Sequence, residues 1–375
     1  MNDFVEQFLN ENWEGVRDAP RIYVAAFGKH PAWNDHLDDI GLVTGSLVTA
    51  RRMMYGSGIA AQIESAAWEK AGPEKTMATF DHVLLWRRGA ESLVGRIWSS
   101  RDGKGRTLYP MAVVVHAIAQ PFERIANDVL PALLHVEGRC LPAKTPSEVI
   151  AALNDTQEKL RGRAGGGAEA LAVPDSTLGI RGWAAWAIQE RPALERVIHH
   201  LRGQWMVFGP EQRGWCEAEG PAQSRILRVP RVPGSTPAEA LNAWISFVAT
   251  QINPAVPLLG LVHRDQPWVE VIAGEPAPGD WFVLRANAAA VPLVTDIPYQ
   301  IDAETRAAST LLFADLVQGR LPTRSALNGR SLAENRESAD KWLSRFRGSM
   351  TRAIFGRLLS GGGARSNPRF DLNVR

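Results

Sequence analysis

The chain has 375 residues, of which 45% are hydrophobic and 22% are charged, and its formal net charge is +2. This composition is ordinary for a soluble globular protein, and the length is sufficient for two domains. Thirteen tryptophans are an unusually large number for this length, and because the indole N–H needs a partner, we expect many of them to be half-buried or at contact surfaces. The two cysteines, Cys140 and Cys216, form no CxxC spacing, which indicates a reducing compartment and argues against a Cys-based zinc site.

The charge is distributed unevenly along the chain. Between Arg320 and Arg375, twelve basic residues stand against four acidic ones, so the rest of the chain is net acidic. A basic tail on an acidic body predicts an acidic partner, an acidic patch on the same protein, or a membrane surface. The first residues are not typical of a signal peptide, and the longest apolar run, Met111 to Ala119, is too short to span a bilayer. We therefore expect a cytoplasmic protein.

Hydrophobic periodicity and turn residues predict alternating helices and strands in the first half of the chain. Gly56-Ser57-Gly58 is expected to separate two of the helices, and Pro131 to kink a third. Thr145 as N-cap and Glu148 three residues later form a capping box for the last helix. Short turns between three consecutive strands indicate an antiparallel meander. The expected helices are 3–16, 46–55, 59–70, 122–137 and 146–161, and the expected strands are 22–27, 82–87, 92–99 and 108–117.

The second half again mixes helices with strands. The expected helices are 193–201, 238–252 and 303–318, and the expected strands are 204–208, 224–229, 258–263, 268–273 and 281–285. The three glycines at 165–167 mark a linker, because consecutive glycines lose too much entropy in a packed element. The predicted fold class is α/β (α+β), with two domains that each hold a mostly antiparallel sheet flanked by helices. We place these domains at 1–162 and 169–325, with the linker at 163–168 and a basic helical tail at 326–375.

Within that tail, residues 332–359 are predicted to form a helix with an apolar stripe. Trp342, Phe346, Met350 and Ile354 recur every four residues along it. Such stripes usually serve packing, which favours docking on protein, while the basic charge leaves peripheral contact with a membrane open.

The loop after the first strand holds the densest set of polar side chains in the sequence. Lys29, His30, Trp33, Asp35 and His36 stand within eight residues, where loop side chains are free to carry function. A glycine followed by lysine is found in phosphate-binding loops, but the upstream glycine of that motif is missing here. Nitrogen and oxygen ligands for a metal ion such as Zn²⁺ or Mn²⁺ could come from this loop, with His82 or His116 as distant candidates to complete the site, although no HExxH or HxH spacing is present. The candidate ligands are His30, Asp35, His36, Asp38 and Asp39. The alternative is a hydrogen-bonded loop without metal.

A second dense stretch, 98–110, contains Ser100, Asp102 and Arg106. Its glycines and cations resemble a phosphate site, but its place between two expected strands favours a hairpin turn. The sequence contains no GxSxG motif, and neither cysteine has the context of a nucleophile. The sequence therefore contains no complete catalytic motif.

Taken together, the two stretches resemble the N-terminal domain of TagF, a regulator associated with type VI secretion. The matching residues are Gly28-Lys29-His30-Pro31 with Asn34-Asp35-His36, then Ser100, Gly105-Arg106 and Tyr109-Pro110. Asn34 replaces the family's usual glycine and His36 its usual aromatic residue. The resemblance covers roughly the first 140 residues.

The resemblance implies a non-enzymatic repressor that acts after translation through protein contacts, in some cases with forkhead-associated partners. We therefore expect a cytoplasmic adaptor or regulator with no cofactor, no bound metal and no nucleic-acid partner. The alternative is a metal-dependent hydrolase built on His30, Asp35 and His36. If the protein is an adaptor or regulator, five side chains either contact a partner or hold the loop in place for one: Lys29, Trp33, Asp35, His36 and Arg106. Asp35 would then accept loop N–H bonds, and Arg106 would bridge to it.

Overall fold

The computed structural model of the chain describes residues 21–120, 124–165, 186–187, 189–200, 226–251, 256–298 and 300–317. The helix expected at 3–16, the strand expected at 204–208 and the tail helix expected at 332–359 lie outside these residues. The described part is α+β, as the sequence predicts.

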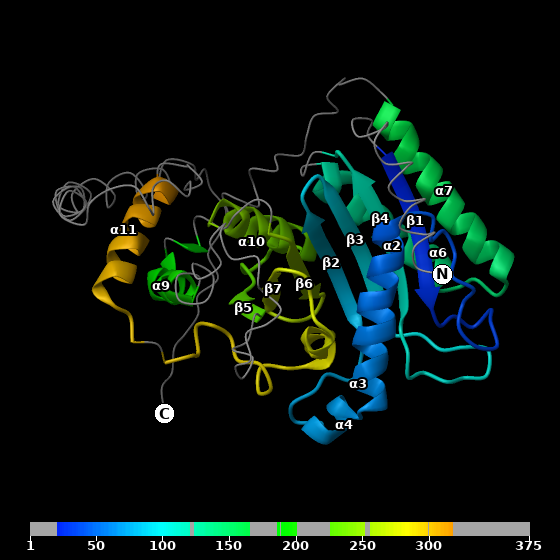
Figure 1. Cartoon of the computed structure of the whole chain (residues 1–375), viewed down its shortest axis with the longest axis horizontal. Coiled ribbons are helices and arrows are strands. Elements are labelled where there is room, and N and C mark those ends of the chain that lie inside the picture. The colour runs from blue at the N-terminus through cyan, green and yellow to red at the C-terminus, as the bar shows by residue number, and fades with distance from the viewer. Residues whose placement is uncertain are drawn as a thin grey trace, which may run out of the picture.

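Seven strands form one antiparallel sheet in the order β1-β4-β3-β2-β6-β7-β5 (Figure 1). The expected meander is confirmed, because β2, β3 and β4 are neighbours in the sheet. The strands are β1 (Arg21–Gly28), β2 (Asp81–Arg88), β3 (Glu91–Trp98), β4 (Met111–Ile118), β5 (Ile226–Pro230), β6 (Leu258–His263) and β7 (Trp268–Ala273).

The sheet runs without interruption through both halves of the chain. β2 pairs with β6 from His82 opposite His263 to Arg87 opposite Leu258. The expectation of a separate sheet in each half is therefore wrong, while the position of a domain boundary stays a prediction. The reason lies in β2, whose residues 82–86 are all buried, so both of its faces and both of its edges need partners.

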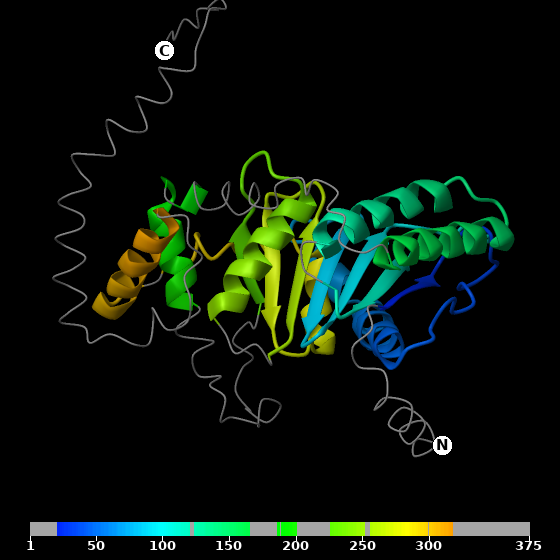
Figure 2. The same cartoon turned by 90° about the horizontal axis from the view of Figure 1, so that it is seen from above.

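Helices cover both faces of the sheet (Figure 2). One face carries α6 (Leu130–Cys140), preceded by the π-helical turn η2 (Ile125–Val129), with α7 (Pro146–Gly165) and α10 (Pro237–Gln251). The other face carries α2 (Gly45–Ala50), the π-helix η1 (Arg51–Ile59), α3 (Ala60–Glu64), α4 (Ala67–Ala71) and the 3-10 helix η5 (Pro278–Arg285). Helices α9 (Arg191–His200) and α11 (Ala303–Val317) pack against each other beyond α10.

The helix starts follow local sequence closely where caps are present. The expected capping box of α7 is confirmed, because the N–H of Glu148 donates to Thr145 Oγ1 and the N–H of Thr145 donates to the Glu148 carboxylate. Helix α7 continues through Gly165, so it takes up the beginning of the expected linker.

The glycines at 56–58 do not break the helix, contrary to expectation. The helical path from α2 runs on through η1 into α3, and the break comes at Ala66, whose φ is 52°. Gly58 serves close packing instead, because a Cβ there would lie 2.4 Å from Cδ1 of the buried Trp281. The segment expected as a strand at 281–285 belongs to η5, which brings Trp281 down onto this glycine.

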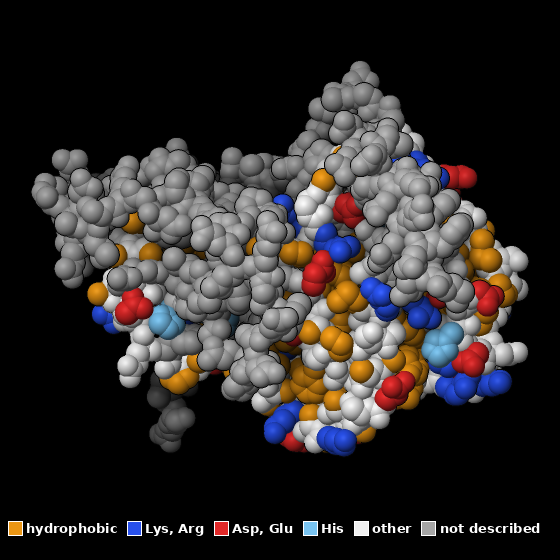
Figure 3. All heavy atoms as spheres, viewed as in Figure 1, with side chains coloured by type: hydrophobic (Ala, Val, Ile, Leu, Met, Phe, Trp, Pro, Cys, Tyr) orange, Lys and Arg blue, Asp and Glu red, His pale blue; other side chains and the backbone are white. Residues whose placement is uncertain are grey.

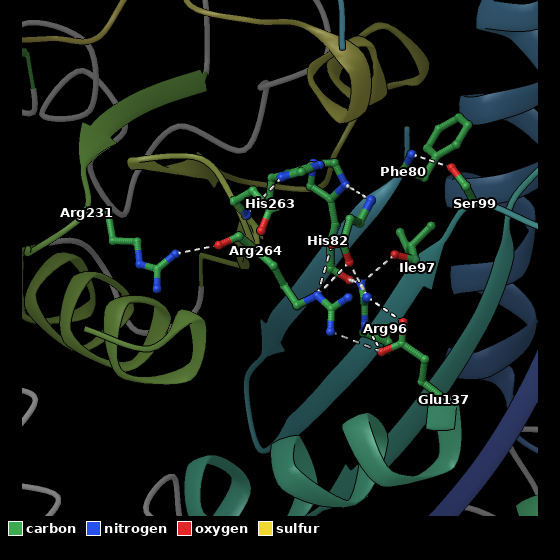
Figure 4. A network of polar contacts seen from close by, with 11 residues as sticks. Phe80, His82, Arg96, Ile97, Ser99, Glu137, Arg231, His263 and Arg264 are labelled. Atoms are coloured by element: carbon green, nitrogen blue, oxygen red, sulfur yellow. Dashed lines mark hydrogen bonds and ion pairs between the residues drawn. The ribbon is translucent and has the colours of Figure 1, made fainter. Parts of the chain in front are cut away.

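A buried ionic cluster ties α6 to the sheet near the joint between β2 and β6 (Figure 4). The Arg96 side chain is fully buried, and its guanidinium donates to both Glu137 carboxylate oxygens, at 2.8 Å and 2.7 Å, and to Asp81. It also donates to the carbonyls of His82 and Ile97. Arg264, at the end of β6, donates to Asp81 from the other side of the joint. The buried charges are thus matched by several bonds each, as burial requires.

Two histidines face each other across the same joint. The rings of His82 and His263 are buried, with centroids 5.0 Å apart in an edge-to-face arrangement. In both rings Nδ1 accepts a backbone N–H, so the neutral ring carries its proton on Nε2. Burial lowers the pKa of both side chains, and for His82 the neighbouring His263 and Arg96 lower it further.

This pair predicts a loss of stability at mildly acidic pH. Because His82 stays neutral in the fold but titrates near 6.5 when unfolded, its contribution is complete above pH 6.5 and declines as the pH falls below it. His82→Leu replaces the imidazole with an apolar side chain that cannot be protonated. The decline in stability between about pH 7.5 and pH 5 should therefore be weaker in this variant. Urea unfolding across this range measures it. An unchanged pH profile in His82→Leu would show that the pair does not couple to folding.

Candidate functional site

One end of the sheet brings together the two loops that the sequence singled out. Strand β1 ends at Gly28, directly opposite Met111 at the start of β4, and the N–H of Lys29 donates to the Pro110 carbonyl at 3.1 Å. Gly28 has φ of +113°, and a Cβ there would lie 2.3 Å from the Pro110 oxygen. Only glycine fits this turn, which holds the loop after β1 beside residues 99–110.

Lys29 lies buried between two carboxylates, one from each loop. Its side chain is 4% exposed, and its ammonium lies 2.6 Å from Asp102 Oδ2 and 3.1 Å from Asp35 Oδ1. A buried ammonium is costly unless it is paired and hydrogen-bonded, and this one is both. Because the charge of Lys29 is already matched by two carboxylates, its ammonium is not free to bind a phosphate, as the weak similarity to a phosphate-binding loop would require.

Asp102 is the centre of this network. Its Oδ1 accepts the N–H groups of Lys104 and Arg106, each at 3.0 Å, and its Oδ2 accepts Arg106 Nε at 2.6 Å besides Lys29. Burial alone would raise the pKa of Asp102, but the bonds from Lys29 and Arg106 outweigh it and hold that pKa well below its usual value. The sequence analysis gave the role of accepting loop N–H bonds to Asp35, and the structure gives it to Asp102.

The expected bridge from Arg106 to Asp35 is present, with 3.0 Å between Arg106 Nη2 and Asp35 Oδ1. The same guanidinium donates to the Asn34 carbonyl at 3.1 Å, and the N–H of Gly103 donates to the Trp33 carbonyl at 2.6 Å. The two loops are thus joined by side-chain and backbone bonds. Figure 3 shows basic and acidic side chains gathered beside a histidine at the right-hand edge, where Figure 1 places these loops.

His30 points into the protein and is fully bonded. Its Nε2 donates to the Cys140 carbonyl at 2.8 Å, and its Nδ1 accepts the N–H of Ala32 at 3.1 Å. Burial lowers the pKa of His30 more than the Cys140 carbonyl raises it, so the ring is neutral near pH 7. Trp33 packs edge-to-face on His30 at 5.8 Å and donates its indole N–H to Asp38. Neither ring nitrogen of His30 is left for a metal.

His36 lies on the outside of the loop. Its side chain is 43% exposed, and Nδ1 lies 3.1 Å from Asp35 Oδ1. The ring stacks edge-on against Tyr109 at 5.1 Å and Tyr55 at 5.9 Å. Both tyrosines pack against the loop. The sequence analysis named Tyr109 only as part of the resemblance and did not single out Tyr55, because nothing in the local sequence of either shows the contact.

Ser100 does not join the ionic network. It lines a groove of about 480 Å³ beside the two loops. The other lining residues are His30, Pro31, Ala78, Thr79, Trp98, Ser99, Arg101, Thr107 and Leu141. They come from four separate segments, so sequence spacing alone gives no signal for this groove.

The histidines considered as further metal ligands lie elsewhere. His82 faces His263, and His116 lies 2.9 Å from the Thr44 hydroxyl and 3.2 Å from the Glu91 carboxylate. Thr44 is the N-cap of α2, so this contact ties the start of α2 to β3 and β4. Within the ranges that the structure describes, no group of three or more His, Cys, Asp or Glu side chains could hold a metal ion.

Comparison of the chain with models of known protein families and with curated proteins gives no match. The resemblance to TagF thus rests on the two loops alone. Among the helices in the described part of the chain, none is both long and apolar enough to cross a membrane.

The ionic network predicts a distinct acid response. Because the pKa of Asp102 is depressed from 3.8, its contribution to stability is complete above that pH and is lost as the pH falls through the depressed value. Asp102→Asn should therefore lower stability at neutral pH and reduce the further loss between about pH 5 and pH 2. Urea unfolding at these pH values measures both effects. Asp39→Asn serves as the control, because it removes an exposed carboxylate from the loop after β1 that pairs with Arg51 at the surface and lies outside the Lys29 network. Equal behaviour of the two variants would contradict the role of Asp102.

Proposed function

We propose that the protein is a non-enzymatic adaptor or regulator that acts through protein contacts made by the loops after β1 and β3. The observation that supports this most strongly is the state of Lys29, Asp102 and Arg106. Their charges are matched within the network, and none is placed as a general base or nucleophile toward a substrate. Side chains of catalytic type are used here to fix two loops against each other.

What the fixed loops present outward is suited to recognition. Pro31, Asn34, Asp35 and His36 are exposed, and Trp33 is partly exposed beside them. Aromatic residues are enriched at the centres of protein interfaces, and a loop already held in one conformation loses little entropy on binding. The network would therefore give a partner a preformed surface.

The resemblance to TagF gives the setting of the proposal. On that basis the partner is a component of a bacterial type VI secretion system or a forkhead-associated protein, and the regulation acts after translation in the cytoplasm. The basic tail at 326–375 would add docking on protein or peripheral contact with a membrane, and it lies outside the described residues.

Recovery of native complexes from the source cell tests this function. The tagged wild-type protein should retain a secretion-system or signalling component. Trp33→Ala should lose it even at temperatures well below its own Tm, which the loss of the indole contacts with His30 and Asp38 should lower. Val48→Ala, on the exposed side of α2, removes an apolar side chain from a surface away from the loop and should leave capture intact. Equal recovery with Trp33→Ala, or no such component with the wild type, would contradict the proposal.

A further inference from the structure

The groove beside the two loops has a chemical character that the proposed contact surface does not use. Its apolar part is made by Pro31, Trp98 and Leu141, and the Leu141 side chain is 59% exposed. Leu108, next to the lining residue Thr107, is another large apolar residue left 46% exposed. An apolar surface of this kind beside polar groups is typical of a binding groove.

The groove is lined by a positively charged side chain and by hydroxyl groups, with no negatively charged side chain among the lining residues that the structure describes. Arg101 is exposed and has no carboxylate partner in the described ranges, and no acidic side chain lines the groove. Beside it, the hydroxyls of Thr79, Ser100 and Thr107 make no hydrogen bond to any part of the chain that the structure places. One unpaired guanidinium with free hydroxyl donors fits a carboxylate.

The walls of the groove are held in place before any ligand binds. Ser99 exchanges two bonds with Phe80, from its own N–H to the Phe80 carbonyl at 2.8 Å and from the Phe80 N–H to the Ser99 hydroxyl at 2.7 Å (Figure 4). The opposite wall is fixed by the bond from His30 to the Cys140 carbonyl. Arg101 directly precedes Asp102, so the Lys29 network sets the position of its backbone.

We propose that this groove binds an extended acidic segment of the partner protein. A carboxylate of that segment pairs with Arg101 and the hydroxyls, and a neighbouring apolar residue packs on the exposed Leu141 and Pro31. The inference rests on the proposed function, to which it adds the chemistry of the recognised segment.

Site-specific photo-crosslinking in the source cell tests the inference. In one variant, a photoreactive phenylalanine derivative replaces Leu141 in the groove. In a second variant, it replaces His36 on the loop surface. Mass spectrometry then identifies the crosslinked segment. From position 141 we expect a segment of another protein that carries Asp or Glu within a few residues of an apolar residue.

Charge reversal supplies the matched control. Arg101→Glu should lower the crosslinking yield at 141 by about tenfold, the effect of losing one interfacial ion pair, and Arg101→Lys should retain most of it. Lys159→Glu makes the same change of charge away from the groove and should not change the crosslinking yield. Lys159 lies in the part of α7 that contacts the start of β1.

The two crosslinking positions separate the possible failures. Crosslinks at 36 but not at 141 would overturn the groove and leave the proposed function standing, and crosslinks at neither would overturn both. A segment without acidic residues, a crosslink to the protein's own chain, or a yield unaffected by Arg101→Glu would each overturn the acidic partner segment.

Discussion

The arrangement of the two loops after β1 and β3 depends on one buried charge, the ammonium of Lys29. Lys29 directly follows the last residue of β1, where the pairing with β4 turns its side chain inward. Burying an ammonium demands carboxylates at hydrogen-bond distance, and the sequence provides Asp35 from the same loop and Asp102 from the loop after β3. Arg106 then matches the charge that a second carboxylate introduces. The two loops adopt their shape because this charge must be satisfied.

The sheet determines which segments can meet there. Antiparallel pairing places the last residue of β1 beside the first of β4, and the last residue of β3 beside the first of β2. Both loops and the groove therefore lie at the same end of the sheet. The joint between β2 and β6 extends this frame into the second half of the chain. Near it, the cluster around Arg96 fixes α6, and the end of α6 supplies the Cys140 carbonyl and Leu141. Core ion pairs, loop and groove thus form one connected arrangement.

Local sequence predicted most of the elements and named the residues of the ionic network. The capping box at Thr145 and the strand periodicity depend only on near neighbours, which explains their success. The errors arose where distant residues decide. Gly58 was predicted to break a helix, because its packing against the distant Trp281 is not visible in the local sequence. Asp102 is the centre of the network only because Lys29, which follows another strand, contacts it. The groove had no sequence signal, because its walls come from separate segments.

Hydrogen–deuterium exchange on the purified protein tests most directly whether Lys29 and Asp102 hold both loops as one unit. In the wild type, the amides of Gly103 and Leu37, which donate to backbone carbonyls of the loops, should exchange slowly. In Asp102→Asn, residues 29–39 and 99–110 should both exchange faster while the amides of β2 and β6 keep their protection. Acceleration confined to 99–110, with 29–39 unchanged, would contradict the account.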